Sequence, residues 1–115
     1  MARVKRGVTS HARHKKVLSL TKGFRGGRSK LIKEAKSSLL HAGEYAFAGR
    51  KLRKRDMRAL WIVQLGNAVR NEGLSYSKFI SALKSKKINL DRKILAELAV
   101  NNIEDFRQIV ETVRG

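Results

Sequence analysis

The sequence contains no cysteine and no proline, and it has no long apolar run. Without cysteine there is neither a disulfide framework nor a thiolate metal site, and without proline nothing forbids long helices. No apolar run approaches the roughly 20 residues of a membrane span, and no hydrophobic region of a secretory signal opens the chain. A transit peptide has a similar basic composition, but the basic character continues to Arg58, far past a usual presequence. We therefore expect a soluble protein that works in the cytoplasm, where it is made.

Acidic residues are scarce, and they are scarcest at the N-terminal end. The 115 residues include 27 Lys and Arg but only nine Asp and Glu, a net charge of +18. The first acidic residue is Glu34, and eleven cations precede it. Residues 1–58 hold 18 cations against three acids, whereas residues 59–115 hold nine against six. So much uncompensated charge opposes compaction in water, and the dense phosphates of a nucleic acid are the obvious partner.

The charge asymmetry predicts two domains. Residues 1–58 form a basic extension that consists of an extended tail over residues 1–8, a short helix and a long helix. Residues 59–115 form a compact helical domain that is near the lower size limit for folding alone. Its candidate core residues are Leu60, Trp61, Ile62, Leu65, Val69, Leu74, Tyr76, Phe79, Ile80, Leu83, Ile88, Leu90, Ile94, Leu95, Leu98, Val100, Ile103, Phe106, Ile109, Val110 and Val113.

Two helices are predicted in the extension. The first is capped by Thr9 or Ser10 and runs through Lys22, with Gly23 as its C′ residue. The second runs from about Ser29 to Asn71 and ends before Gly73, with Gly43 and Gly49 as points where it could bend. A continuous helix of that extent is about 65 Å long at 1.5 Å per residue, longer than a chain of this size needs for a globule.

Three more helices are predicted in the compact domain. Ser75 or Ser77 begins one that runs to about Ser85, and Asp91 caps the next. Asn102 and Asp105 resemble a capping box for the last. No segment has the period of a strand, so the expected fold class is all-α.

The strongest nucleic-acid signal is Arg50–Arg58, with six cations in nine residues. At about 100° per residue these cations cover roughly 200° of a helix and leave Leu52 and Asp56 opposite them. So wide a basic surface suits a helix with nucleic acid on more than one side. The alternative is a solvated charged face, which explains this segment but not the rest of the extension.

The segment Gly23–Arg28 places three glycines beside two arginines. Glycines let backbone N–H groups approach a phosphate, and arginines bind phosphate bidentately. It is not a Walker loop, because no Gly-Lys-Ser/Thr follows. A flexible hinge is an equally good interpretation and is compatible with RNA contact. Phe24 has no local core, so we expect it to stack on a base or enter an RNA cleft.

Other side chains are less decisive. His11 and His14 have ligand-like spacing, but no further ligands accompany them, so phosphate or base contact is favoured over a metal site. His41 is interpreted as structural. Tyr45 and Phe47 fit either a protein-packing patch or an RNA-facing one, and the stripe Trp61–Val69 is expected in the core. No clustered carboxylates or paired histidine supports catalysis, and no cofactor or small-molecule substrate is expected.

Polar and basic residues around the turns of the compact domain suggest a second RNA surface. Free N–H groups at the helix N-termini of Ser75 and Asp91 favour anions there. Ordinary surface lysines and caps are the alternative for any single residue. The members of this group are Asn67, Arg70, Ser75, Ser77, Lys78, Lys84, Lys86, Lys87, Arg92 and Lys93.

Six ordered blocks resemble one known family, that of the bacterial large-subunit ribosomal protein numbered twenty. They are Met1–Gly7, Arg13–Val17, Lys22–Gly26, Arg53–Ile62, Gly73–Phe79 and Leu90–Ala99. The blocks span nearly the whole chain, which makes the resemblance specific. Phe24 stands where the family usually has Tyr, and Gly27 adds a second glycine to the turn.

The resemblance implies an all-α protein that binds large-subunit rRNA directly, acts early in subunit assembly and is not an enzyme. It also implies neighbouring large-subunit proteins as partners, and some family members repress translation of their own mRNA. The expected RNA-binding residues, called the predicted RNA-binding set below, are Arg3, Lys5, Arg6, Arg13, His14, Lys15, Lys16, Lys22, Phe24, Arg25, Arg28, Arg50, Lys51, Arg53, Lys54, Arg55, Arg58, Ser75, Ser77, Lys78, Arg92 and Lys93.

Two other functions compete with this one. A nucleoid DNA-binding protein would fit the charge, but such proteins usually have a dimer interface or apolar wedges. A membrane-surface helix needs a broad apolar face that the basic helix lacks, so no membrane partner is expected. We further expect the extension to order on RNA, with its ordering entropy offset by phosphate contacts.

Overall fold

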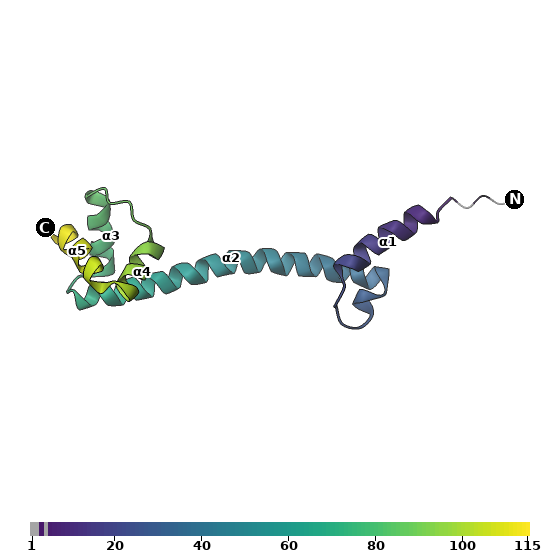
Figure 1. Ribbon diagram of the computed structural model, residues 1–115, viewed down its shortest axis with the longest axis horizontal. Coiled ribbons are helices and arrows are strands. Elements are labelled where there is room, and N and C mark those ends of the chain that lie inside the picture. Colours follow the sequence, from purple (N-terminus) through teal and green to yellow (C-terminus); the bar gives the residue numbers. More distant parts are fainter. Residues whose placement is uncertain (1–2, 4) are drawn as a thin grey trace. The chain divides into compact units, whose positions relative to one another are not determined.

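The computed structural model describes residue 3 and residues 5–115, and every regular element in them is a helix (Figure 1). This confirms the all-α prediction. The elements are α1 (Val8–Leu20), the 3-10 turn η1 (Gly26–Ser29), α2 (Ile32–Asn71), α3 (Tyr76–Ser85), α4 (Arg92–Asn101) and α5 (Ile103–Arg114). None of the helices in this part of the chain is long and apolar enough to cross a membrane.

The chain divides into two compact units, Met1–Lys51 and Leu52–Gly115, and α2 contributes to both. Expectations for Met1, Ala2 and Val4 lie outside the described residues. The functional division between residues 1–58 and 59–115 stays a prediction.

Helix α1 begins and ends earlier than predicted. Its N-cap is Gly7, whose carbonyl accepts from the His11 N–H at 3.0 Å, so the prediction of Thr9 or Ser10 was wrong. Glycine ranks close to threonine as an N-cap, which lets the helix start upstream of both hydroxyl residues. The C-cap is Thr21, which is fully buried and whose hydroxyl donates toward the carbonyls of Val17 and Leu18 at 3.4 and 3.3 Å. Gly23 therefore lies two residues past the cap and is not the C′ residue, although its φ is +86°.

Helix α2 begins at Ile32, three residues later than predicted, because η1 occupies Gly26–Ser29. The helix is continuous through Gly43 and Gly49. It ends at Asn71 as predicted, in a Schellman motif with Gly73 at φ +78°. Gly73 N–H donates to the Arg70 carbonyl at 2.9 Å, and Leu74 N–H donates to the Val69 carbonyl at 3.0 Å.

The predicted N-caps of α3 and α4 are confirmed. For α5 the predicted N-cap residue is correct, but the hydrogen bonds of the predicted capping box are not formed. Ser75 Oγ accepts from Lys78 N–H at 3.4 Å, and Asp91 Oδ1 accepts from Ile94 N–H at 2.8 Å. Asn102 is the N-cap residue of α5, but its side chain caps no backbone N–H. Its amide Nδ2 donates instead to Asp105 Oδ2 at 3.4 Å, because the Asn102 backbone, at φ −134° and ψ 72°, is outside the usual cap geometry.

In the second unit, α3, α4 and α5 gather around the C-terminal part of α2, and α5 packs against α3 and α4 (Figure 1). The rings of Phe79 and Phe106 meet in the core with their centroids 5.9 Å apart. Trp61 packs against this core, so the expected placement of its stripe is confirmed. The buried core residues are Leu65, Val69, Phe79, Leu83, Leu95, Ala96, Phe106, Val110 and Val113.

Part of the predicted core is exposed. The residues concerned are Leu60, Leu90, Ile94, Val100 and Ile103, with exposed fractions from 38% to 64%. Helical periodicity locates an apolar stripe but does not say how far the neighbouring helices cover it, so residues at the margins were assigned wrongly. Ala96, by contrast, is buried and was not predicted, because a small side chain gives a weak periodic signal.

Candidate nucleic-acid interface

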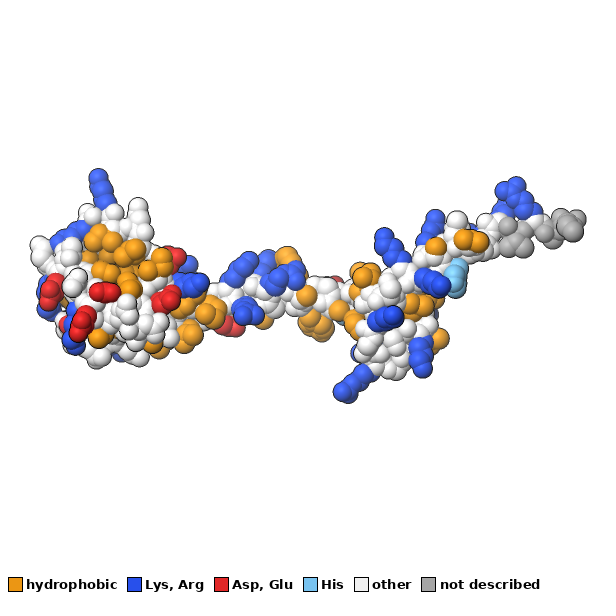
Figure 2. Space-filling view, in the orientation of Figure 1, with side chains coloured by type: hydrophobic (Ala, Val, Ile, Leu, Met, Phe, Trp, Pro, Cys, Tyr) orange, Lys and Arg blue, Asp and Glu red, His pale blue; other side chains and the backbone are white. Residues whose placement is uncertain are grey.

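The first unit is a basic surface with almost no opposing charge. Residues 1–51 carry 14 Lys and Arg, and their acids are Glu34 and Glu44. Lys and Arg side chains project from this unit, whereas Asp and Glu side chains gather on the second (Figure 2). Among its described residues only Thr21 and Ala35 are buried. The unit therefore presents nearly all of its cations to solvent.

The predicted contacts before and on α1 are all accessible. Arg3, Lys5 and Arg6 precede the helix and are exposed. The four predicted residues on α1 are exposed as well, and the helix has no buried residue. They are Arg13, His14, Lys15 and Lys16.

The loop after α1 is a defined turn that presents cations outward. Lys22, Arg25 and Arg28 are exposed, whereas Phe24 is half-buried. Phe24 N–H donates to the Thr21 carbonyl at 3.1 Å, which holds the backbone just before η1. Gly23 and Gly26 have φ of +86° and +65°, values that favour glycine. These glycines allow the turn to close and aim the arginines at solvent.

The basic run of α2 is exposed at every predicted position. In the first unit, Arg50 is exposed and Lys51 Nζ lies 4.5 Å from the centroid of the Phe47 ring. In the second unit, the four remaining cations of the run are exposed as well. They are Arg53, Lys54, Arg55 and Arg58.

In the second unit, one hydrogen bond joins the two predicted helix starts. Arg92 Nε, at the first residue of α4, donates to the phenol oxygen of Tyr76, at the first residue of α3, at 2.9 Å. The beginnings of α3 and α4, with Ser75, Ser77, Lys78 and Lys93, therefore form one polar edge. Tyr76 was expected only as a core residue; its phenol also orients a basic side chain.

Other cations of this unit are engaged internally. Arg107 Nε lies 2.9 Å from Glu72 Oε1, and Arg114 Nη2 donates to the Glu72 carbonyl at 2.8 Å. Lys86 Nζ donates to the Thr112 carbonyl. These contacts tie α5 to the ends of α2 and α3 and leave the polar edge as the better candidate surface.

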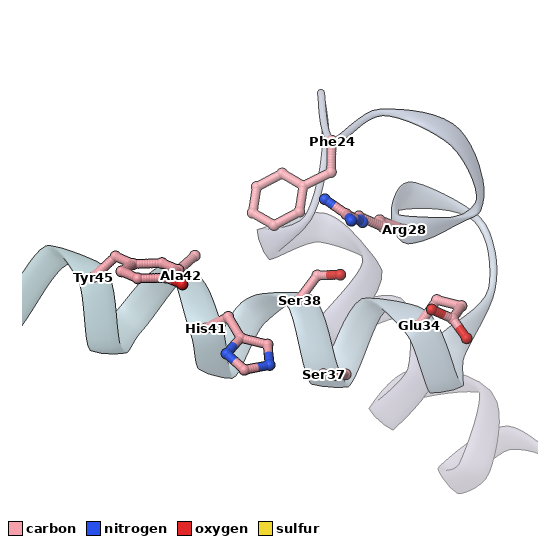
Figure 3. Close-up of a pocket in the computed structure, with 8 residues that line it drawn as sticks. All are labelled: Phe24, Arg28, Glu34, Ser37, Ser38, His41, Ala42 and Tyr45. Atoms are coloured by element: carbon pink, nitrogen blue, oxygen red, sulfur yellow. The ribbon is translucent and has the colours of Figure 1, made fainter.

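A cleft in the first unit contains residues that sequence analysis did not assign to the site. We call it the loop–helix cleft; Phe24 and Arg28 of the loop face one side of α2 across it (Figure 3). Its α2 residues are Glu34, Ser37, Ser38, His41, Ala42 and Tyr45. Their spacing of three and four residues was a signal that they share a helix face, but the opposing loop was not visible in the sequence.

His41 is an exposed member of this cleft, and its contacts are with neighbouring side chains of α2, so its interpretation as structural stays a prediction. Its ring stacks on Tyr45 with the centroids 6.5 Å apart, and its Nδ1 lies 3.4 Å from Glu44 Oε2. In the described part of the chain no group of three or more His, Asp or Glu side chains is arranged to hold a metal. The candidate site is therefore a surface of cations, aromatic rings and hydroxyls.

A family model described as ribosomal protein L20 matches residues 3–109. The chain belongs to the ribosomal protein L20 family. L20 proteins are structural components rather than enzymes, so the family membership confirms both the resemblance and the expected lack of catalysis.

Relatives match over nearly their whole length. The large ribosomal subunit protein bL20 of Alkaliphilus metalliredigens is 56% identical over 114 residues, 99% of this chain and 96% of the relative. The bL20 protein of Methylibium petroleiphilum is 53% identical over 115 residues, 100% of this chain and 98% of its own. That of Desulfovibrio desulfuricans is 51% identical over 113 residues, covering 98% and 96%.

Proposed function

We propose that this chain binds large-subunit rRNA directly and promotes an early step of subunit assembly. As an L20 family member it is a structural constituent of the large ribosomal subunit, on the ribosome in the cytoplasm. The observation that carries the RNA-binding proposal is the first unit's exposed charge, 14 cations against two acids. When such a surface binds RNA, the counterions condensed around the RNA phosphates are released, and this release favours binding.

The predicted RNA-binding set divides into two surfaces with different tasks. The cations of residues 3–58 neutralise phosphates, and this contact is independent of base sequence. The polar edge at the starts of α3 and α4 offers shape and hydrogen-bonding complementarity to a folded RNA. Ser75 and Asp91 each cap one backbone N–H there, and the first N–H groups that remain have no partner within the helices and favour phosphate oxygens.

Promotion of assembly follows from neutralisation. RNA segments repel one another through their phosphates, and a polycationic chain placed between them reduces this repulsion. The bound protein therefore stabilises an RNA intermediate in which the segments are close. We propose neighbouring large-subunit proteins as further partners. A messenger RNA site that mimics the ribosomal one would be bound by the same surfaces, which would permit repression of the protein's own synthesis.

Competition binding tests the proposal. The full chain is bound to large-subunit rRNA fragments at physiological salt and challenged with duplex DNA and with unrelated structured RNA of equal length. We expect one rRNA fragment to be retained against both competitors, with an affinity that falls steeply as salt rises. Equal affinity for the rRNA fragment and for both competitors would overturn rRNA recognition and favour the nucleoid alternative. Charge alone gives a salt slope but no such preference.

A further inference from the structure

The loop–helix cleft has the size and walls of a site for a small planar group. Its volume is about 570 Å³, within the roughly 300–1,000 Å³ common for small-molecule sites. On the α2 side, the small side chain of Ser38 faces Phe24 of the loop, and Ala42 lies next to Tyr45 (Figure 3). This leaves a recess between Phe24 of the loop and the His41–Tyr45 pair of the helix.

The aromatic walls differ in how firmly they are held. Phe24 is half-buried and its backbone is fixed by the bond to the Thr21 carbonyl. Tyr45 is 76% exposed, although its ring stacks on His41. So much exposed aromatic surface beside a recess is available for stacking on another flat ring, and every base has such a face.

The charged groups define an orientation. No carboxylate lies within ion-pair distance of Arg28 in the described part of the chain, and Arg28 is exposed beside Phe24 (Figure 3). Its guanidinium is free to bind a phosphate bidentately. Glu34 is the only carboxylate among the residues that line the cleft. It repels phosphate and lies eleven residues before Tyr45 on α2, about 16 Å along the helix, so a base stacked on Tyr45 does not reach it.

We propose that the loop–helix cleft binds one unpaired nucleobase of the RNA, stacked on Tyr45 and Phe24, with a flanking phosphate on Arg28. Any of the four bases can fill the cleft, because every base has a flat face that stacks on an aromatic ring. The inference rests on the proposed rRNA binding and adds one base-stacking contact to a surface that otherwise binds phosphates.

Base-specific chemical probing of the full chain on large-subunit rRNA tests this. Dimethyl sulfate reports accessible adenine and cytosine edges, kethoxal reports guanine, and a carbodiimide reagent reports uracil. We expect the chain to protect one unpaired base that becomes reactive with Tyr45→Ala and stays protected with Tyr45→Phe. Loss of one stack should weaken binding about five- to hundredfold. The slope of log affinity against log salt should not change, because no phosphate contact is lost.

Two further variants separate stacking from other causes. Phe47→Ala removes another exposed aromatic ring from the same unit but outside the cleft, and should leave the protected base protected. Arg28→Ala should reduce the salt slope by about one unit. Since Tyr45 is exposed, its replacement should not alter the circular dichroism spectrum, which serves as the folding control.

The outcomes distinguish the two proposals. If the chain shows no preference for rRNA over the competitors, the proposed function fails. If it retains that preference but Tyr45→Ala exposes no base and leaves affinity unchanged, only the nucleobase site is refuted. If the base is protected only when neighbouring ribosomal proteins are added, those proteins and not the cleft cover the base. That result would also refute the nucleobase site.

Discussion

At the residue scale, Lys87 is the non-glycine residue with positive φ among those that the structure describes, at φ +56°. It occupies the C′ position of α3 in a Schellman motif, with Lys87 N–H donating to the Lys84 carbonyl and Ile88 N–H to the Leu83 carbonyl. A side chain in this conformation costs about 1 kcal/mol. We predict that Lys87→Gly raises the free energy of unfolding by about that amount in urea denaturation.

Lys87→Ala is the matched control. It removes the same charge but keeps Cβ, so the backbone penalty remains and no comparable gain is expected. An equal gain in both variants would assign the effect to charge repulsion and contradict the conformational explanation.

Phe106 gives a second residue-scale prediction, because it is fully buried against Phe79. Phe106→Ala should destabilise the second unit by about 3–5 kcal/mol. A domain this small has little stability to lose, so helix content measured by circular dichroism should fall at 25 °C. Phe106→Leu keeps most of the volume and should remain folded, and equal loss of helix in both would contradict a volume effect.

At the element scale, the glycines of the first unit should respond to alanine with opposite signs. Gly43 is inside α2, and a Cβ added to it would meet nothing within 4 Å. Gly43→Ala should therefore stabilise the helix by about 0.5–1 kcal/mol. Gly23→Ala, at φ +86°, should destabilise the turn despite equally open space. Thermal unfolding followed at 222 nm checks both, and a gain at Gly23 would contradict the argument.

Local signals explain which helix boundaries were predictable. Asp91 and Ser75 each precede an apolar periodic segment and bond to a backbone N–H three residues on, so sequence located α3 and α4. The predicted start of α1 was wrong because Gly7 is the N-cap, although Thr9 and Ser10 nearby are residue types that are usually preferred as N-caps. Residues at the margins of the core, such as Val100, were wrongly predicted to be buried. Whether another helix covers them depends on tertiary packing, which the local sequence does not show.

The candidate site was predictable only where charge sufficed. Exposed cations such as Arg53 and Lys54 need no tertiary information, since a run with so many cations and so few apolar residues is rarely buried. The loop–helix cleft required the turn at Gly23 and Gly26 to place Phe24 and Arg28 opposite α2. Sequence showed the helical spacing of Glu34, His41 and Tyr45, but it did not show what faced them.

At the scale of the whole molecule, the two units should differ in resistance to local opening. The described residues of the first unit bury only Thr21 and Ala35, whereas the second unit buries nine apolar side chains in one core. Helices with few buried contacts open locally at a low free-energy cost. Residues 1–51 have a net charge of +12, and the repulsion among these charges lowers the free energy of opening further. We predict fast amide hydrogen exchange over residues 5–51 of the free protein and slow exchange in the core helices.

Addition of large-subunit rRNA should slow exchange in the first unit far more than in the second, because phosphates convert the repulsion into attraction and pay the cost of ordering. Sodium chloride is the control. It screens the repulsion but supplies no bound polyanion, so it should restore only part of the protection. If residues 5–51 already exchange as slowly as the core without RNA, ordering on RNA is refuted, and the basic helices must be held by their own backbone hydrogen bonds.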